Sequence, residues 1–400
     1  MSCFDIEACR KGASRAYSLC ASAPGRCVLA SKEMEPTRPA RPSKLDTYVR
    51  AKRVGEFSMA TDGSQTALLE CANSMILRRG LYAYLVLVKL IWNHLPTLLR
   101  GLSLGRAYGR HLHGLVRLLA KRKQYFATFF LRNRAELELM RRLLERKAHG
   151  ADLDISVLAC SKGAEVYSVA WTIRSARPDL TLRMHAIDIS QEILEFAEKG
   201  VYSLRNGLDI AKGSNDEDRM NRGDMAWNTA RDQNAPMFER MTDKEVEAMF
   251  EIEGDEARVR PWIKGGVIWL RGDVGDPELL RLLRPQDMVL ANRFLCHMEP
   301  AAAERCLRNI ARLVEPGGYL FVSGIDLDVR TGLARELGWK PVGDLIKDIH
   351  EGDPSLRQGW PLEYWGLEPF WDDRSDWKVR YASVFQIGEG PHQMSQERAQ

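Results

Sequence analysis

A glycine-containing turn and a later aspartate are spaced as in nucleoside-binding sites. The apolar run 156–159 predicts a buried parallel strand, and it ends at the turn Cys160–Gly163. Glycine in that turn allows the backbone to approach a ligand closely. A second predicted strand, 182–187, ends at Asp188, whose carboxylate can accept hydrogen bonds from two ribose hydroxyls. Because no GxGxxG motif is present, we expect a nucleoside cofactor without a pyrophosphate, and S-adenosylmethionine is the commonest of these.

A third predicted strand, 288–291, ends at Asn292 and Arg293. The methyl group of a sulfonium is already activated, so catalysis would consist mainly of alignment. A carboxylate acceptor needs only an orienting arginine such as Arg293, whereas an alcohol or amine could need a base, for which His297 and Tyr167 are candidates. Plainer interpretations stay open: His297 as a packed residue, Tyr167 as a core or cofactor-stacking residue, Arg293 as a surface ion-pair partner and Asp188 as a helix cap.

These residues carry a resemblance to a known family. The segment Cys160–Ala170, CSKGAEVYSVA, resembles the first motif of the CheR-type chemotaxis methyltransferases, Cys-Ser-x-Gly-Glu-Glu-x-Tyr-Ser-hydrophobic-Ala. Further segments are similar to later family motifs, and the resemblance spans about residues 125–323: Phe129-Phe130 with Arg132, Ala186–Ser190, Asp287–Met298 and Val314–Leu320. The chain departs from the family at Ala164, where the motif has a first glutamate. It also has Asn292-Arg293 in exchanged order, and Arg132 is displaced by one residue from the Phe-Phe pair.

The resemblance implies a class I methyltransferase fold, S-adenosylmethionine as cofactor, and methyl transfer to a glutamate carboxylate on an acidic helical receptor. It implies a cofactor site in which Glu165 contacts the methionine, Asp188 holds the ribose, and Asp273 and Val274 flank the adenine. The full expected cofactor set is Cys160, Ser161, Gly163, Glu165, Asp188, Ile189, Asp273, Val274 and Asn292. The expected catalytic residues are Asn292, Arg293 and Tyr167, and the expected substrate-binding residues are Arg132, Arg293 and His297.

The elements that must position these residues alternate between strands and helices. Helices are predicted over 165–174, 191–199 and 301–314, and strands over 156–159, 182–187, 288–291, 319–323 and 379–387. This alternation predicts an α/β fold, a Rossmann-like doubly wound sheet, within a methyltransferase domain of residues 149–390. Inserts are expected at about 206–262 and 333–377. The first contains a polar loop over 206–236 and a β-containing subdomain, with a helix and then β segments over 241–274.

The aromatic insert 333–377 has two interpretations. It contains Trp339, Trp360, Tyr364, Trp365, Phe370 and Trp371. It is either a structural cap or a lid that makes an apolar pocket for a small organic acceptor.

The first part of the chain differs in composition from the rest. Residues 1–60 are expected to form a disordered tail, and 61–148 a basic α-helical domain with helices over 68–77, 81–95, 108–119 and 135–147. No Asp or Glu occurs between Glu70 and Glu136, where twelve Lys and Arg residues lie. A stripe of Arg106, Arg110, Arg117 and Lys121 is either a solvated helix face or a docking surface. Such a domain attracts an acidic protein, nucleic acid or anionic lipid.

Composition narrows the remaining possibilities. The chain has 400 residues, a net charge of +4 and no apolar stretch of the ~20 residues that a membrane span needs. Its eight cysteines include no CxxC pair, so we expect free thiols, a cytoplasmic location and no metal. We therefore predict a CheR-type methyltransferase acting on a protein carboxylate. One alternative is a small-molecule O- or N-methyltransferase with an aromatic lid. The other is a catalytically inactive cofactor-binding module that acts in signalling or binds nucleic acid, although nucleic acid is the less favoured partner.

Overall fold

The computed structural model describes residues 66–120, 122, 128–204, 237–353, 356–357 and 359–388, with side chains from Arg79 onward. All of them belong to one compact unit, residues 43–400. The tail expected over 1–60 and the loop expected over 206–236 lie outside the described residues.

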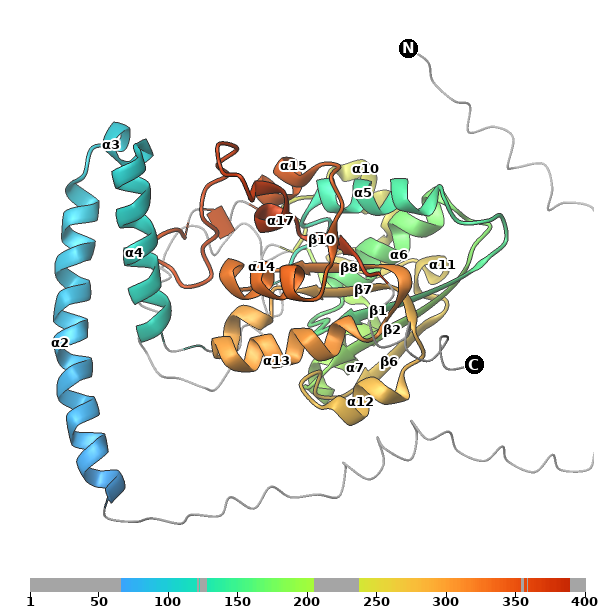
Figure 1. Ribbon diagram of the computed structural model, residues 1–400. Coiled ribbons are helices and arrows are strands. Elements are labelled where there is room, and N and C mark those ends of the chain that lie inside the picture. The colour runs from blue at the N-terminus through green and yellow to red at the C-terminus, as the bar shows by residue number, and fades with distance from the viewer. Residues whose placement is uncertain are drawn as a thin grey trace, which may run out of the picture. The chain divides into compact units, whose positions relative to one another are not determined.

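A seven-stranded sheet forms the centre of the molecule (Figure 1). Its strands run, in spatial order, β6 (Val267–Arg271), β2 (Thr181–Asp188), β1 (Asp152–Leu158), β7 (Gln286–Asn292), β8 (Val314–Ser323), β10 (Val384–Gln386) and β9 (Lys340–Pro341). Neighbouring strands are parallel from β6 to β8, and β10 is antiparallel to both of its neighbours. This arrangement confirms the predicted α/β class I methyltransferase fold. The carboxyl ends of the parallel strands therefore meet at one edge, with β1 at the point where the strand order reverses.

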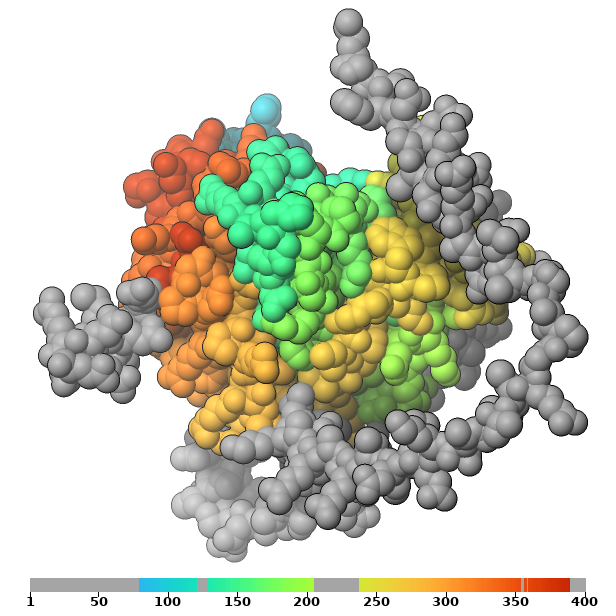
Figure 2. Space-filling view, turned by 90° about the vertical axis from the view of Figure 1, so that its right-hand side faces the viewer, coloured from blue at the N-terminus to red at the C-terminus, as the bar shows by residue number. Residues whose placement is uncertain are grey.

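Helices cover both faces of the sheet. One core layer includes α5 (Arg134–Leu144), α6 (Ala164–Ala176) and α7 (Gln191–Lys199). The other includes α12 (Pro277–Leu282), α13 (Pro300–Ala311), α14 (Leu327–Glu336) and α17 (Trp377–Tyr381). The bounds of α7 agree with the prediction because its caps are local: the Ser190 hydroxyl accepts from the amide of Ile193, and Gly200 ends the helix with a φ of 61°. In the space-filling view α5 lies directly beside α6 (Figure 2).

The first insert is a small subdomain beside α6 and α7. It contains α10 (Asp243–Met249), α11 (Pro261–Lys264) and a three-stranded antiparallel sheet of β3 (Val201–Ser203), β5 (Glu256–Val259) and β4 (Phe250–Glu253). Phe130, Tyr202 and Phe250 pack edge to face in its core. The expectation that β segments after Val259 belong to this insert is wrong, because β6 pairs with β2 in the main sheet.

The C-terminal predictions also need correction. Residues 333–336 end α14, and 340–341 form β9 of the main sheet, so the insert proper is 342–376, with α15 (Ile346–Glu351). The expected final strand 379–387 is shorter: residues 379–381 complete α17, and β10 covers only 384–386. The helix expected to run to Val314 ends at Ala311, and Val314 instead begins β8. A short 3₁₀ helix, η4 (Leu295–His297), follows β7.

The N-terminal described residues form a helical hairpin (Figure 1). The two helices expected over 68–77 and 81–95 are one helix, α2 (Thr66–His94), because Gly80 stands in open space and does not interrupt it. Helix α3 (Thr97–Gly101) follows Pro96, and α4 (Ser103–Leu119) returns along α2. Leu85, Val88 and Trp92 of α2 pack with α4. Among the described helices, none combines the length and apolarity that crossing a bilayer would require.

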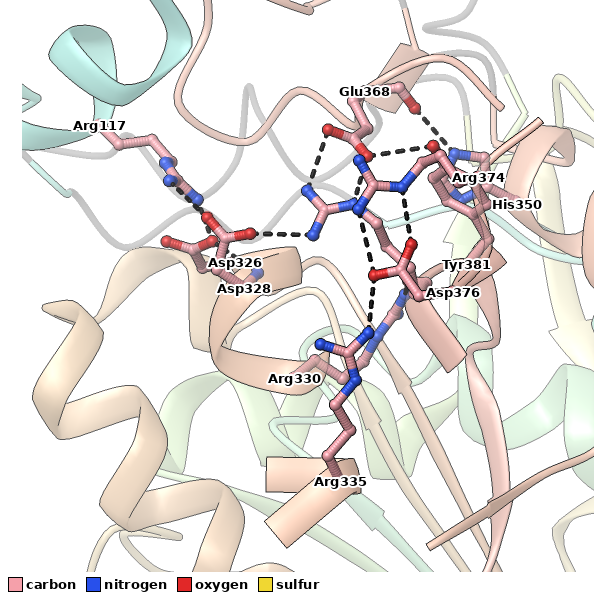
Figure 3. Close-up of polar contacts among 11 residues, drawn as sticks. Arg117, Asp326, Asp328, Arg330, Arg335, His350, Glu368, Arg374, Asp376 and Tyr381 are labelled. Atoms are coloured by element: carbon pink, nitrogen blue, oxygen red, sulfur yellow. Dashed lines mark hydrogen bonds and ion pairs between the residues drawn. The ribbon is translucent and has the colours of Figure 1, made fainter. Parts of the chain in front are cut away.

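Ion pairs connect α4, α14 and the insert 342–376 (Figure 3). Arg117 of α4 pairs with Asp326 and, at 3.3 Å, with Asp328. Arg380 pairs with Glu368 and, at 2.9 Å, with Asp328, and the Tyr381 hydroxyl donates to Glu368 at 3.1 Å. We call these residues the outer cluster: Arg117, Asp326, Asp328, Glu368, Arg380 and Tyr381. Its contacts join segments far apart in the sequence and secure the insert to the catalytic domain.

Candidate functional site

The turn after β1 is held by Asp188 at the end of β2. One carboxylate oxygen accepts from the Ser161 amide at 2.8 Å, and the other accepts from the Ser190 amide at 3.0 Å. Ser161 and Gly163 have φ values of 50° and 82°, which make the turn tight. Burial raises the pKa of Asp188, while its backbone hydrogen bonds lower it. The structure thus brings together Asp188 and the turn that holds Cys160, Ser161 and Gly163, because β1 and β2 are parallel neighbours.

The remaining expected cofactor residues follow the same sheet edge. Ile189 comes directly after Asp188 and is half exposed. Asp273 and Val274 follow β6, the next strand outward, so they lie beyond Asp188 along the edge. The Asp273 carboxylate is exposed and accepts from the Gly275 amide at 2.8 Å, whereas Val274 is buried. This row of strand ends could bind an elongated nucleoside.

Asn292, at the end of β7, is the centre of the polar contacts. Its side-chain amide nitrogen donates to Glu165 at 2.6 Å and to Glu136 at 2.8 Å. Its amide oxygen accepts from the Ser323 hydroxyl, at the end of β8, at 2.8 Å. Two carboxyl groups, from the first turns of α5 and α6, therefore share one neutral donor. Sequence reasoning missed Glu136, which is 156 residues from Asn292 and lies outside the family motifs.

Burial makes both carboxyl groups hard to ionise. Desolvation, followed by repulsion from Glu165, raises the pKa of Glu136 to about 8. Desolvation also raises the pKa of Glu165, although its hydrogen bond from Asn292 and the charges of Arg132 and Arg293 oppose the shift. A buried carboxyl pair of this kind lacks sufficient positive charge nearby. A cationic ligand group placed beside the pair would supply it, so these residues fit the sulfonium and ammonium groups of S-adenosylmethionine.

Three arginines complete the charges of the site. Arg293 pairs with Asp353 of the insert at 2.5 Å, and Arg240 pairs with the same carboxylate at 3.1 Å. Arg132 and Arg240 both lie over the ring of Phe129, at 5.1 and 4.5 Å from its centroid. Desolvation and the charge of Arg293 lower the pKa of Arg132 to about 10, so it is still protonated at neutral pH. We call the combined set the pocket cluster: Arg132, Glu136, Glu165, Arg240, Asn292, Arg293 and Asp353.

A cavity of about 50 Å³ lies among these residues. Ser323, Ile349 and Leu367 contribute to its wall, so the insert 342–376 closes one side of it. His350 also lines it, and its Nε2 lies 2.8 Å from the backbone carbonyl of Glu368. Because a carbonyl only accepts, Nε2 carries the proton and Nδ1 is left as an acceptor. Nδ1 has no hydrogen-bond partner among the described residues, and burial lowers the pKa of His350 to about 4.

Two expected site residues lie elsewhere. Tyr167 is fully buried; its hydroxyl donates to the Ala197 carbonyl at 2.6 Å and its ring contacts Trp269. Burial also raises the pKa of its hydroxyl, and this position in the core supports the plainer interpretation of Tyr167, a core residue, over the expected catalytic role. His297, on η4, has its Nδ1 2.8 Å from the Tyr364 hydroxyl and is not among the residues that line the cavity. The structure thus shows a contact of His297 with the insert, and its expected substrate contact stays a prediction.

Known proteins resemble this chain over its catalytic part. Residues 127–217 match the family model of the CheR methyltransferase, SAM binding domain. Over 187 residues the chain is 25% identical to an uncharacterised 104.1 kDa protein from the hypE 3′ region of Rhodobacter capsulatus. That match covers 46% of this chain but only 16% of the relative, so the chain corresponds to a small part of that protein.

Solved methyltransferases show weak overall similarity. An O-methyltransferase family protein from Burkholderia thailandensis has 13% identity and a TM-score of 0.28, covering 71% of this chain and 62% of that one. Magnesium protoporphyrin IX methyltransferase from Synechocystis, with bound SAM, has 12% identity and a TM-score of 0.27, covering 60% and 89%. Similarities this weak say nothing about the acceptor.

The family match confirms two predictions made from the motifs. The segment that it covers contains the turn after β1, Glu165 and Asp188. The predicted CheR-type resemblance and the predicted cofactor, S-adenosylmethionine, are both confirmed by it. The roles of individual residues stay predictions.

Proposed function

The chain carries a divergent CheR-type, S-adenosylmethionine-dependent methyltransferase domain, and from this premise we propose that it methylates a carboxylate, with a glutamate side chain of an acidic protein as the acceptor. The observation that carries this proposal is the charge of the pocket cluster. Arg132, Arg240 and Arg293 outnumber Asp353 and Glu165, and the remaining acidic residue, Glu136, has a pKa of about 8 and is mostly neutral at pH 7. The cluster therefore favours an anionic acceptor beside the cationic cofactor.

Each residue has a defined part in this proposal. S-adenosylmethionine supplies a methyl group bonded to a positively charged sulfur, which needs no further activation. Asp188 and the turn after β1 would hold the ribose, and Glu165, with Asn292 and Glu136, would hold the cationic end of the cofactor. Arg293 would orient the acceptor carboxylate, whose oxygen forms the new bond to carbon as the carbon–sulfur bond breaks. The carboxylate is already deprotonated, so no general base takes part.

The test uses methyl-labelled S-adenosylmethionine with the full chain and a host lysate. We expect label in protein, and we expect mild base to release it as methanol, as it does from a carboxyl methyl ester. Label that stays bound to protein in base, or that appears only in the small-molecule fraction, would exclude the protein carboxylate.

Two variants test the assignment of residues. Asp188→Ala should weaken cofactor binding about 100-fold, because it removes both the proposed ribose contact and the support of the turn. Arg293→Gln should lower turnover about 30-fold with little change in cofactor affinity. The control is Arg281→Gln, since Arg281 is exposed and pairs with Glu278 on the surface of α12. Greater loss of cofactor affinity than of turnover in Arg293→Gln would show that the acceptor site is misplaced.

A second function is favoured by one specific observation: Nδ1 of His350, in the cavity wall, has no hydrogen-bond partner in the part of the chain that the structure describes. A nitrogen lone pair there suits an acceptor that brings a hydrogen, such as the hydroxyl or amine of a small molecule enclosed by the insert. His350→Gln separates the two functions. Turnover should fall about tenfold for a hydroxyl or amine acceptor and should hardly change for a carboxylate. The predicted cytoplasmic location stays a prediction under either function.

A further inference from the structure

One face of the helical hairpin is apolar although it is exposed. On α2, Leu85, Val88 and Trp92 are at most 6% exposed and pack with α4. Tyr82, Val86 and Leu90 recur every four residues on the opposite side and are 60%, 48% and 51% exposed. A helix that is apolar on both sides normally has both sides covered.

Further exposed apolar side chains lie at the end of the hairpin. Leu98 on α3 is 87% exposed and Leu104 at the start of α4 is 84% exposed. We define the outer face as these nine residues: Tyr82, Val86, Leu87, Leu90, Ile91, Leu98, Leu99, Leu102 and Leu104. Monomeric proteins seldom expose a contiguous apolar patch larger than a few hundred Å², and such patches mark interaction sites. We call the two most exposed of them, Leu98 and Leu104, the leucine tip.

The charges around the outer face are of one sign. The sequence has no Asp or Glu from residue 71 to 135, and Arg79 and Lys89 lie on α2. A second copy of the chain would bring these cations together without any carboxylate to balance them. An anionic lipid surface satisfies both features, because its headgroups are negative and its acyl chains accept the leucine tip.

We propose that the outer face binds the surface of an anionic lipid bilayer, with α2 lying in the interface and Leu98 and Leu104 inserted below the headgroups. Since α2 is too short in apolar length to cross the bilayer, the contact is peripheral. Lysine and arginine side chains at the edge of the face would reach the phosphates while their methylene groups stay among the apolar residues. This binding is independent of the acceptor that the catalytic domain uses.

Vesicle flotation with the full chain tests this proposal. We expect the protein to float with vesicles of equal parts phosphatidylcholine and phosphatidylglycerol, and to float far less with pure phosphatidylcholine or at high salt. Leu98→Ser combined with Leu104→Ser should lower partitioning about tenfold, because both side chains lose the apolar phase. Arg79→Gln with Lys89→Gln should lower it about as much, but only for the anionic vesicles.

The control is Ile252→Ser with Leu337→Ser, at apolar residues that are 42% and 39% exposed on other elements. It should float like the unaltered protein, and all variants should keep the unaltered cofactor affinity, which shows that they fold. Failure of the unaltered protein to float with anionic vesicles would overturn the proposal, and so would full flotation of the leucine pair variant. A dimer in light scattering that the leucine pair variant dissociates would instead identify a second copy as the occupant. Binding of polyglutamate without flotation would identify an acidic protein partner.

Discussion

Two groups of charged residues, the pocket cluster and the outer cluster, lie on the two sides of Leu367, which lines cavities in both. They use the same residue types and both join distant segments, yet their carboxyl groups differ. In the outer cluster Glu368 accepts from both Arg380 and Tyr381, and Asp328 pairs with two arginines. In the pocket cluster Asp353 also pairs with two arginines, but Glu136 and Glu165 share one neutral amide.

The difference shows how one protein separates stability from chemistry. A buried carboxylate with its own guanidinium recovers most of the free energy that desolvation costs. A buried carboxyl group without one has a raised pKa and tends to stay protonated until a cation arrives. We interpret the outer cluster as the attachment of the insert and the pocket cluster as a site left for a ligand to complete. Four changes test this contrast.

The largest effect is expected from Glu368→Ala in the outer cluster. It leaves the buried guanidinium of Arg380 without its main partner, so we expect the free energy of unfolding to fall by about 3–5 kcal/mol. Chemical denaturation measures it. The control, Glu304→Ala, breaks an exposed pair with Arg308 and should change stability by about 0.5 kcal/mol at most. A loss below about 1 kcal/mol for Glu368→Ala would mean that the outer cluster is not the attachment.

Asn292→Leu should disrupt the pocket cluster, and it should lower activity far more than stability. The initial rate of label transfer should fall about 100-fold, which is about 2.7 kcal/mol, because the two carboxyl groups lose their common donor. Unfolding should change much less than in Glu368→Ala. Asn309→Leu, at a half-buried asparagine of α13, serves as the control and should keep its rate. Equal losses of rate in the two variants would contradict the site.

Glu136→Gln should stabilise the protein in a pH-dependent way. Burial raises the pKa of Glu136 from 4.5 to about 8, so the folded protein holds a proton that the unfolded chain releases. The stability of the unaltered protein therefore falls as pH rises from 4.5 to 8, and the uncharged glutamine removes this loss. We expect the variant to be more stable by about 1–2 kcal/mol at pH 8 and nearly equal at pH 4.5. Chemical denaturation of both proteins from pH 4.5 to 8 measures the difference in stability. A difference that does not change with pH would contradict the raised pKa of Glu136.

The smallest effect is expected from Arg117→Gln. Arg117 is 21% exposed, and of its two partners Asp328 is 64% exposed and retains Arg380. The other partner, Asp326, is 10% exposed but still accepts from the Asp328 amide at 3.1 Å, so we expect a loss of about 1 kcal/mol. The rate of label transfer should stay unchanged. Hydrogen exchange should show faster opening of α4 alone, since this pair joins α4 to α14. A large loss of activity would show that the outer cluster also serves catalysis.

Local residue patterns were sufficient to predict the elements whose ends are marked by neighbouring residues in the sequence. The turn Cys160–Gly163, the caps of α7 and the short apolar runs that became β1, β2 and β7 could all be read along the chain. The expected ribose contact rested on the same kind of signal, a strand followed by Asp188. The predicted boundaries were wrong in two places. A break was expected near Gly80, but α2 continues through that residue. Strand β9 has two residues and forms through its pairing with β10, which no local pattern signals.

The sequence by itself determined the α/β class, the cofactor and the strand ends proposed to bind it, because these depend on periodicity and on a contiguous motif. Only the tertiary structure decided which side chains share the pocket. Glu136, Asp353 and His350 reach Asn292 and Arg293 from segments outside every motif, through the strand order and the path of the insert. Tyr167 shows the reverse case: it lies inside the motif, but the packing of α6 against α7 turns its hydroxyl into the core. Burial and partner choice depend on that packing, and they decide which of these groups are charged.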